Sequence, residues 1–265
     1  NVPAGRDGRI LYCVAEDHDQ LAKARRIAAE TTRHDQVVTV VPALPLPLRE
    51  SALEVWCLIQ MQGNHDLVGS DPLVLPEIQQ MLDDARGNLQ RILDQVLRPG
   101  PDGPSWFHQG HRLAVTSRSD LVRRLSDITR RVFHQTPKIH NELVVRRKPS
   151  GTIVNSRKKL LIGMLDRHGQ ENLGIRGRFP DYSMFRTVLL HTGLYRQSDQ
   201  NDGRWGYTPP GALTRHPSGI EPVWSVLQEF FGNPSDNAKE IGALLDELRQ
   251  PPYGIREGLL PILFA

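Results

Sequence analysis

The strongest constraint on the fold is the pattern of residues 8–46, in which two apolar runs flank an amphipathic one. Residues 9–15 (RILYCVA) and 36–41 (QVVTVV) have the length and β-branched content of strands, and we expect the first to be buried. A helix that joins two neighbouring strands makes them parallel, with a right-handed crossover, so we expect a β-α-β unit. Residues 17–33 predict that helix, with one apolar side made of Leu21, Ala24, Ile27 and Ala28.

The middle of the chain is predicted to be helical. The proline-rich residues 42–47 suit an extended connector, and residues 49–61 predict a short helix around Trp56. We expect the next helix, residues 76–97, to pack on another helix of the same chain, with self-association as the alternative. Its apolar residues recur in steps of four and three, the spacing of a seam for a partner helix: Ile78, Leu82, Ala85, Leu89, Ile92 and Val96.

Residues 105–115 predict a hairpin that turns at Gln109-Gly110. Its histidines, His108 and His111, lack a matching cluster at metal-ligand spacing, so no metal site is predicted. Ser117 and Asp120 have the spacing of a helix N-terminal cap. The helix that follows displays four arginines: Arg123, Arg124, Arg130 and Arg131.

Positive charge is concentrated between residues 110 and 170. Fourteen basic residues stand there against four acidic ones, a net charge of +10, whereas the whole chain carries +3. The remainder is therefore acidic, at −7. Such segregation favours a polyanionic partner on one face, either nucleic acid or the phosphates of a nucleotide. The alternative is an arginine-rich surface that simply faces water.

Within this segment, Ser150 is a candidate N-cap for a helix that runs to about His168. At 100° per residue, Arg157 projects into the middle of the apolar arc, while Lys158 and Lys159 fall at its margin or outside it. A guanidinium on an apolar face needs a partner or a route to solvent. Either Arg157 pairs with a carboxylate such as Glu142, or it reaches a phosphate or a cleft.

Residues 153–208 predict the order helix, short LGI stretch, second helix and hairpin, which fits a winged-helix module. The second helix begins at Pro180, but it offers only Arg186 and His191 as polar readers, so base readout would be poor. DNA binding and a role as a lid or protein contact both remain open. Two further helices follow, the second capped by Ser235.

The fold class predicted is therefore mixed α/β and mostly helical. We divide the chain into a β-α-β unit (1–48), a helical segment with the long amphipathic helix (49–136), and a winged-helix-like and helical C-terminal part (137–265). Cys13 and Cys57 lie in apolar surroundings and are expected to be buried free thiols. With no signal peptide and no apolar run of membrane-spanning length, the expected compartment is the cytoplasm, without a membrane partner.

The sequence lacks GxxxxGK[ST] and GxGxxG, so no phosphate-binding loop is identified. The first residue is not Met and the sequence stops on an apolar run, and we therefore expect a fragment of a longer polypeptide. An independent enzyme is disfavoured, because no paired nucleophile and base, metal-ligand spacing or cofactor loop is found.

Three stretches in order, HNELVVRRKPSG (140–151), LGI (173–175) and PPYGIREGLLPILFA (251–265), resemble the region downstream of the nucleotide-binding core in the large bacterial P-loop ATPases of phage-defence loci, the BREX type and its relatives. The resemblance covers about the last half of the chain. It implies a module of a multidomain ATPase in anti-phage defence, with ATP and Mg²⁺ bound elsewhere in the parent protein. Under it, Arg146, Arg147 and Arg157 are candidates for sensing nucleotide.

We therefore expect a non-catalytic regulatory or nucleic-acid-binding segment that contacts DNA or the remainder of its own ATPase chain. The alternative is a protein-interaction scaffold without nucleic-acid contact. No catalytic residue, metal or cofactor is assigned to the segment itself. The candidate nucleic-acid contacts are Arg123, Arg124, Arg130, Arg131, Lys148, Lys158, Lys159 and Arg186.

Overall fold

The computed structural model describes residues 6–31, 34–69, 71, 73–177, 179–198, 203–210, 218–232 and 240–265. As predicted, the protein is mixed α/β and mostly helical. It splits into two compact units, Asn1–Arg131 (unit 1) and Val132–Ala265 (unit 2), and each is described by itself.

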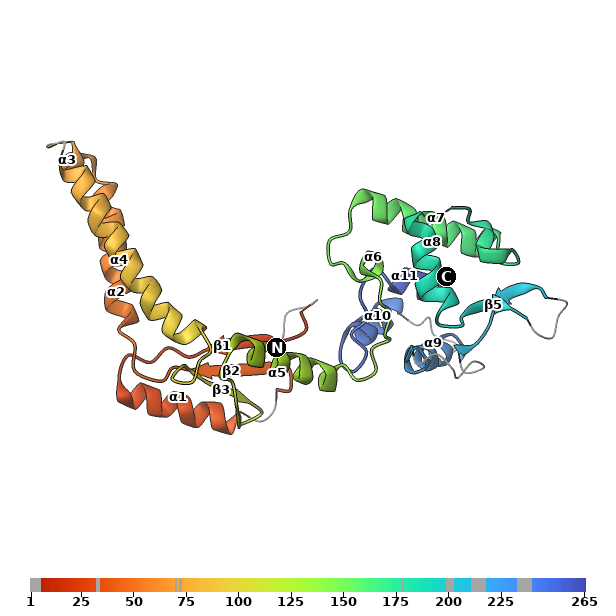
Figure 1. Cartoon of the computed structure of the whole chain (residues 1–265), viewed down its shortest axis with the longest axis horizontal. Coiled ribbons are helices and arrows are strands. Elements are labelled where there is room, and N and C mark those ends of the chain that lie inside the picture. The colour runs from red at the N-terminus through yellow and green to blue at the C-terminus, as the bar shows by residue number, and fades with distance from the viewer. Residues whose placement is uncertain are drawn as a thin grey trace. The chain divides into compact units, whose positions relative to one another are not determined.

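Unit 1 is built on a four-stranded sheet with the order β1-β2-β3-β4 (Figure 1). β1 and β2 pair in parallel, which confirms the predicted β-α-β unit, while β3 and β4 extend the sheet antiparallel. Helix α1 packs on the sheet through Leu21, Ala24 and Ala28. The elements are β1 (Arg9–Tyr12), α1 (His18–Glu30), β2 (Val37–Val41), β3 (Ser105–His108) and β4 (His111–Leu113).

The predicted hairpin turn at Gln109-Gly110 is confirmed. Both residues have positive φ, 50° and 76°, which is the backbone that a two-residue turn between twisted strands requires. Glycine adopts this conformation without strain, and it occupies the second position.

β1 was expected to be buried, and that expectation is wrong. The strand lies at the edge of the sheet, and all four of its residues are exposed. An apolar run of strand length does not distinguish a central strand from an edge strand, because the difference depends on which segments pair beside it.

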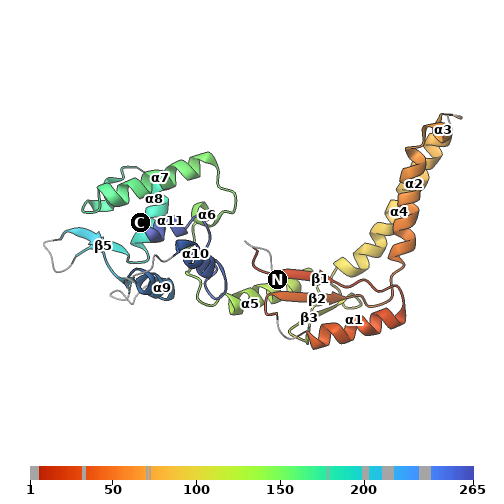
Figure 2. The ribbon, with the colours of Figure 1, turned by 180° about the vertical axis from the view of Figure 1, so that it is seen from behind.

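The connector and the long helix of unit 1 are found as predicted. Helices α2 (Leu48–Gln62) and α4 (Val74–Leu97) lie side by side as a hairpin with the short helix α3 (His65–Val68) at its tip (Figures 1 and 2). The seam of α4 faces α2, where Leu58, Leu82 and Ala85 form a buried cluster. The partner of the seam is thus a helix of the same chain.

Cys57 was expected to be buried and is exposed, because α2 turns the side that carries Leu58 toward α4. Cys13 is half-buried beside the α1 cluster, and both thiols are free. The last helix of unit 1 is α5 (Arg118–Val132). The predicted cap is found at its start, where the Ser117 Oγ accepts a hydrogen bond from the Asp120 N–H at 3.1 Å.

Unit 2 contains the predicted order of helix, LGI turn, helix and hairpin. That this arrangement is a winged helix remains a prediction, and hairpin residues 199–202 lie outside the described residues. The elements are α6 (Glu142–Val145), α7 (Gly151–Asp166), the 3-10 turn η1 (Glu171–Gly174), α8 (Pro180–Phe185), its π-helical continuation η2 (Arg186–Leu190), β5 (Tyr195–Gln197) and β6 (Trp205–Tyr207).

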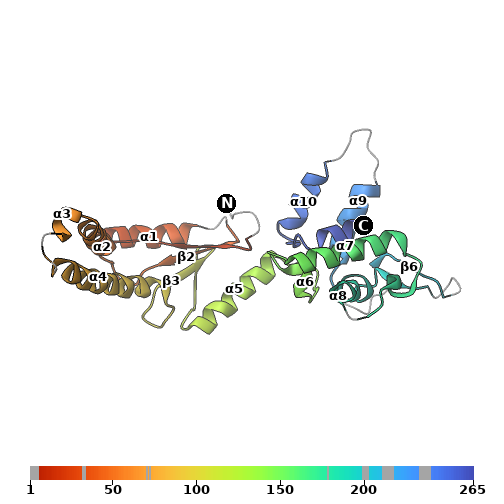
Figure 3. The same ribbon diagram turned by 90° about the horizontal axis from the view of Figure 1, so that it is seen from above.

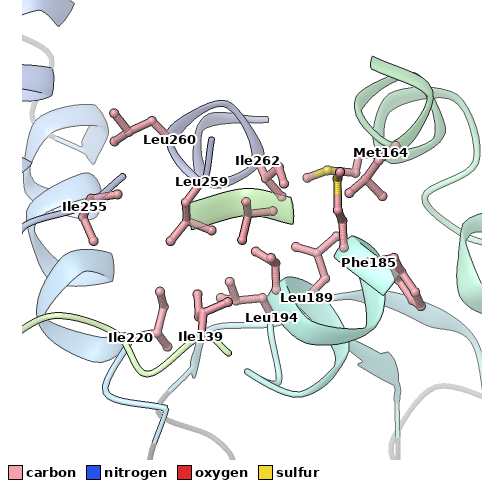
Figure 4. Packing of buried hydrophobic residues seen from close by; sticks show 14 of the residues in the cluster. Ile139, Met164, Phe185, Leu189, Leu194, Ile220, Ile255, Leu259, Leu260 and Ile262 are labelled. Atoms are coloured by element: carbon pink, nitrogen blue, oxygen red, sulfur yellow. The ribbon is translucent and has the colours of Figure 1, made fainter. Parts of the chain in front are cut away.

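Three helices complete unit 2: α9 (Glu221–Gly232), α10 (Ile241–Arg249) and α11 (Leu260–Phe264). The predicted cap Ser235 lies outside the described residues. Helix α11 packs next to α7 (Figure 3), so the C-terminal segment is part of the core. Figure 4 shows that core, where α7, α8, α11 and the segments between them contribute side chains that include Met164, Phe185, Leu194, Ile255 and Ile262.

Candidate nucleic-acid interface

The predicted cationic segment contributes to both units. Its basic residues form two groups, one on α5 in unit 1 and one around α6 and α7 in unit 2. A surface that binds phosphates needs cations that local acids do not neutralise, and the two groups differ in this respect.

On α5, carboxylates of the same helix engage two of the four candidate arginines. Arg123 pairs with Asp120 at 2.5 Å and Arg130 pairs with Asp127 at 3.2 Å. The pKa of Asp120 is lowered, first by the hydrogen bond from the Thr116 hydroxyl and also by Arg123. These pairs are solvent-exposed, so they add little stability, but they reduce the net positive charge that α5 presents.

The other two arginines of α5 differ from each other. Arg131 donates from Nε to the Asp127 carbonyl at 3.4 Å, a long bond at an exposed position. Arg124 is half-buried, and its Nε is enclosed without a hydrogen-bond partner among the described residues. Neither residue therefore presents the whole of its guanidinium to solvent in the way that a free surface arginine does.

The group in unit 2 retains more of its charge. Arg146 pairs with Glu142 at 3.0 Å, one helical turn away on α6, and Arg147 lies exposed beside it. Lys148, Lys158 and Lys159 are exposed, and within the described part of the chain none of the three forms an ion pair or hydrogen bond. The connection into α7 and the outer side of α7 thus carry an uncompensated positive surface, which we call the α7 cationic surface.

Arg157 does not pair with Glu142, the carboxylate proposed for it from the sequence. Glu142 accepts from Arg146 instead, because the two residues are four apart on one helical turn. The half-buried Arg157 side chain reaches the C-terminal segment, where Nη1 approaches the Gly258 carbonyl oxygen at 3.4 Å. This contact therefore links two segments that are 101 residues apart in sequence.

The candidate recognition helix consists of α8 and its continuation η2, and several of its polar groups bond to other parts of unit 2. Arg186 donates from Nε to the His191 ring at 3.2 Å, so the two residues expected to read bases contact each other. The Asn141 amide, at the start of α6, bonds to the Ser183 carbonyl at 3.1 Å and to the Thr187 hydroxyl at 2.8 Å. The opposite side of α8 is in the core.

Two exposed arginines outside the predicted set lie near these elements. Arg176 precedes α8, and Arg204 lies next to β6 of the hairpin. Both stand in connections outside the cationic segment of residues 110–170, so the charge pattern did not mark them. If the hairpin acts as a wing, Arg204 is the cation that it presents beside β6.

Unit 2 also contains an apolar pocket of about 500 Å³. Its lining is mostly apolar. The polar side-chain groups are the Gln228 amide, the Trp224 indole N–H, which is buried without a hydrogen-bond partner among the described residues, and the Tyr207 hydroxyl, which donates to the Met164 carbonyl at 2.9 Å. Burial, with a smaller contribution from Tyr195, raises the pKa of Tyr207 to about 12. None of the described lining residues has a charged side chain that could bind a phosphate.

Within the described residues, no group of three or more His, Cys, Asp or Glu side chains is placed to hold a metal ion. His108 contacts the Asp35 carbonyl through Nε2 at 2.7 Å. No helix in the described part of the chain combines the length and apolar character needed to cross a membrane. Comparison with known proteins found no match among protein-family models, curated proteins or solved structures.

Proposed function

We propose that this chain is a non-catalytic nucleic-acid-binding segment that contacts the phosphate backbone, with DNA favoured, through the α7 cationic surface. In line with the sequence resemblance, we place it as a regulatory part of a large multidomain ATPase in anti-phage defence. The observation that carries the proposal is the group of three exposed lysines, Lys148, Lys158 and Lys159, without acidic partners among the described residues.

The charge distribution supports unit 2 over α5 as the principal contact. Phosphate binding releases counterions in proportion to the cations that reach phosphates. On α5, Asp120 and Asp127 already neutralise two arginines. We therefore assign Arg123, Arg124, Arg130 and Arg131 a secondary role.

The binding mode that we propose is independent of base sequence. Base readout needs side chains that project freely into a groove. On α8 and η2, Arg186 donates to the His191 ring, and the Asn141 amide donates to the Ser183 carbonyl and to the Thr187 hydroxyl. We therefore assign Arg186 no role in reading bases, and it can serve only as a phosphate contact. Affinity should then change little among duplexes of equal length and different sequence.

The proposal is tested by reversing the three lysine charges and measuring affinity for a fluorescently labelled duplex. The variant Lys148→Glu, Lys158→Glu, Lys159→Glu should bind at least about tenfold more weakly, because three phosphate contacts are lost. All three residues are exposed, so the fold should be retained, which circular dichroism checks.

A matched control separates a local surface from net charge. The variant Lys23→Glu, Arg26→Glu, Arg91→Glu changes the net charge by the same amount at exposed positions of α1 and α4. It should bind nearly as well as the wild type. Equal loss of affinity in both variants would show that only overall charge matters and would refute the α7 cationic surface as the site.

A second candidate function is protein contact, and a specific observation favours it. The outer side of α7 also exposes Val154, Ile162 and Leu165, the last with 65 % of its surface accessible. Apolar side chains interleaved with lysines suit a protein partner better than a phosphate backbone. If this function is the correct one, Leu165→Asp disrupts the interaction and the lysine reversal has a smaller effect.

For the parent ATPase, we propose Arg146, Arg147 and Arg157 as candidates for sensing nucleotide. Arg157 is the most specific of these, because its contact with the Gly258 carbonyl ties α7 to the C-terminal segment. The test is ATP hydrolysis by the full-length protein with Arg157→Ala at unchanged thermal stability. Unaltered hydrolysis would end this part of the proposal.

A further inference from the structure

Helix α2 is apolar on two opposite sides. One side, with Leu58, packs against α4, as described above. At 100° per residue, Trp56 lies about 160° from Leu58 in one sense and Leu53 about 140° in the other, so both are on the opposite side, while Ile59, at about 100°, lies at the edge of that side. An ordinary surface helix has a single apolar stripe, so the second one requires an explanation.

The second stripe is exposed. Trp56 has 58 % of its surface accessible, Leu53 55 % and Ile59 41 %, and Cys57 is exposed at the margin. No described element of unit 1 covers these side chains. Helix α4 has no such second stripe: its outer side is mainly polar and charged, with residues such as Asp83, Arg86, Gln90 and Asp94.

We propose that this stripe, Leu53, Trp56 and Ile59 on α2, is the contact by which two copies of the chain associate, with the two α2 helices antiparallel about Trp56. Two α2–α4 hairpins then form a four-helix arrangement in which the large exposed side chains of each copy are covered by those of the other. The occupant is a second copy because the stripe is complementary to itself in this orientation.

The charges select the antiparallel orientation. Arg49 lies on the same side as the stripe near the start of α2, and Asp66 lies just beyond its end, in α3. An antiparallel pair therefore sets Arg49 of one copy near the Asp66 end of the other. A parallel pair would instead align Arg49 with Arg49 of its own copy, which like-charge repulsion disfavours.

The size of the contact sets the expected affinity. A helix of 15 residues is about 22 Å long, so one stripe per copy buries less than the roughly 800 Å² per partner of a standard interface. The dimer should therefore be transient, with a dissociation constant in the micromolar range or weaker. Association is expected to increase over a protein range from about 5 to 500 μM.

Sedimentation velocity of the full chain over that range tests the proposal. The wild type should shift from monomer to dimer, and Trp56→Glu should raise the dissociation constant at least about tenfold, because it places a charge opposite its own copy at the centre of the contact. Met81→Glu is the matched control, since Met81 on α4 is equally exposed, at 55 %, but lies outside the stripe. A wild type that stays monomeric, or an equal loss in Met81→Glu, overturns the proposal.

Cys57 gives a second test that needs no change in the stripe. Antiparallel pairing about Trp56 brings the two Cys57 residues close together, but packed helix axes are about 8–10 Å apart, which exceeds the Cα separation of most disulfides. A short bismaleimide should therefore crosslink Cys13→Ser protein into a dimer and leave Cys57→Ser monomeric. Absence of a Cys57-dependent dimer at high concentration contradicts the antiparallel contact.

Discussion

Gly258→Ala should destabilise unit 2 because two backbones meet at this position. A Cβ added at Gly258 would overlap the carbonyl oxygen of Val144 and lie 2.9 Å from its carbonyl carbon and 3.2 Å from its Cα. Val144 belongs to α6 and is fully buried, so neither backbone segment can move aside without shifting an element of the core. The backbone angles of Gly258 are not in the left-handed region, so the cost is steric overlap rather than strain.

The expected loss is about 1–3 kcal/mol, the range for an added methyl in a packed core. For a unit of this size, 2 kcal/mol corresponds to a decrease in Tm of roughly 5–10 °C. Differential scanning calorimetry of the full chain measures it. Gly87→Ala in α4 is the matched control: a Cβ there meets nothing within 4 Å, so it should stabilise unit 1 by about 0.5–1 kcal/mol through helix propensity. If Gly258→Ala leaves the melting profile unchanged, the close approach of α6 and the C-terminal segment is wrong.

Leu82→Ala should destabilise unit 1 by about 2–5 kcal/mol by leaving a cavity in the α2–α4 seam, while Met81→Ala at the adjacent exposed position should change little; urea unfolding compares them. Asn141→Ala should cost unit 2 about 1–3 kcal/mol, because the buried Asn141 side chain bonds to part-buried polar groups of α6, α8 and η2, which lose their partner. Asn141→Asp, which keeps only the cap, should recover part of this loss. The pKa of Tyr207 is raised to about 12 in the folded protein, whereas an unfolded tyrosine ionises near pH 10. Unit 2 should therefore lose stability as pH rises from about 10 to about 12. Thermal melts against pH should show a shallower decline for Tyr207→Phe.

The elements that the sequence predicted are those specified by local pattern. The α4 seam follows from apolar steps of four and three, and the β3–β4 turn follows from the chemistry of Gln109-Gly110. Both depend on residues less than 25 positions apart. Their existence and approximate limits could therefore be derived without knowledge of the tertiary arrangement.

The features that were missed or wrong depend on contacts between distant segments. The edge position of β1 is set by which strands pair beside it, and the exposure of Cys57 depends on which of the two apolar sides of α2 faces α4. In the candidate site, the partner of Arg157 lies 101 residues away at Gly258. The hydrogen bond from the Asn141 amide to the Thr187 hydroxyl also joins separate segments, and no periodic pattern in the sequence predicts it.

The salt dependence of duplex affinity tests most directly whether the α7 cationic surface binds phosphates. With three lysines and neighbouring arginines contacting phosphates, the logarithm of the association constant should fall with the logarithm of salt concentration with a slope of about −3 or steeper. The triple lysine reversal should reduce that slope by about 3. A flat, weak response of the wild type would contradict nucleic-acid binding and favour the protein-contact function.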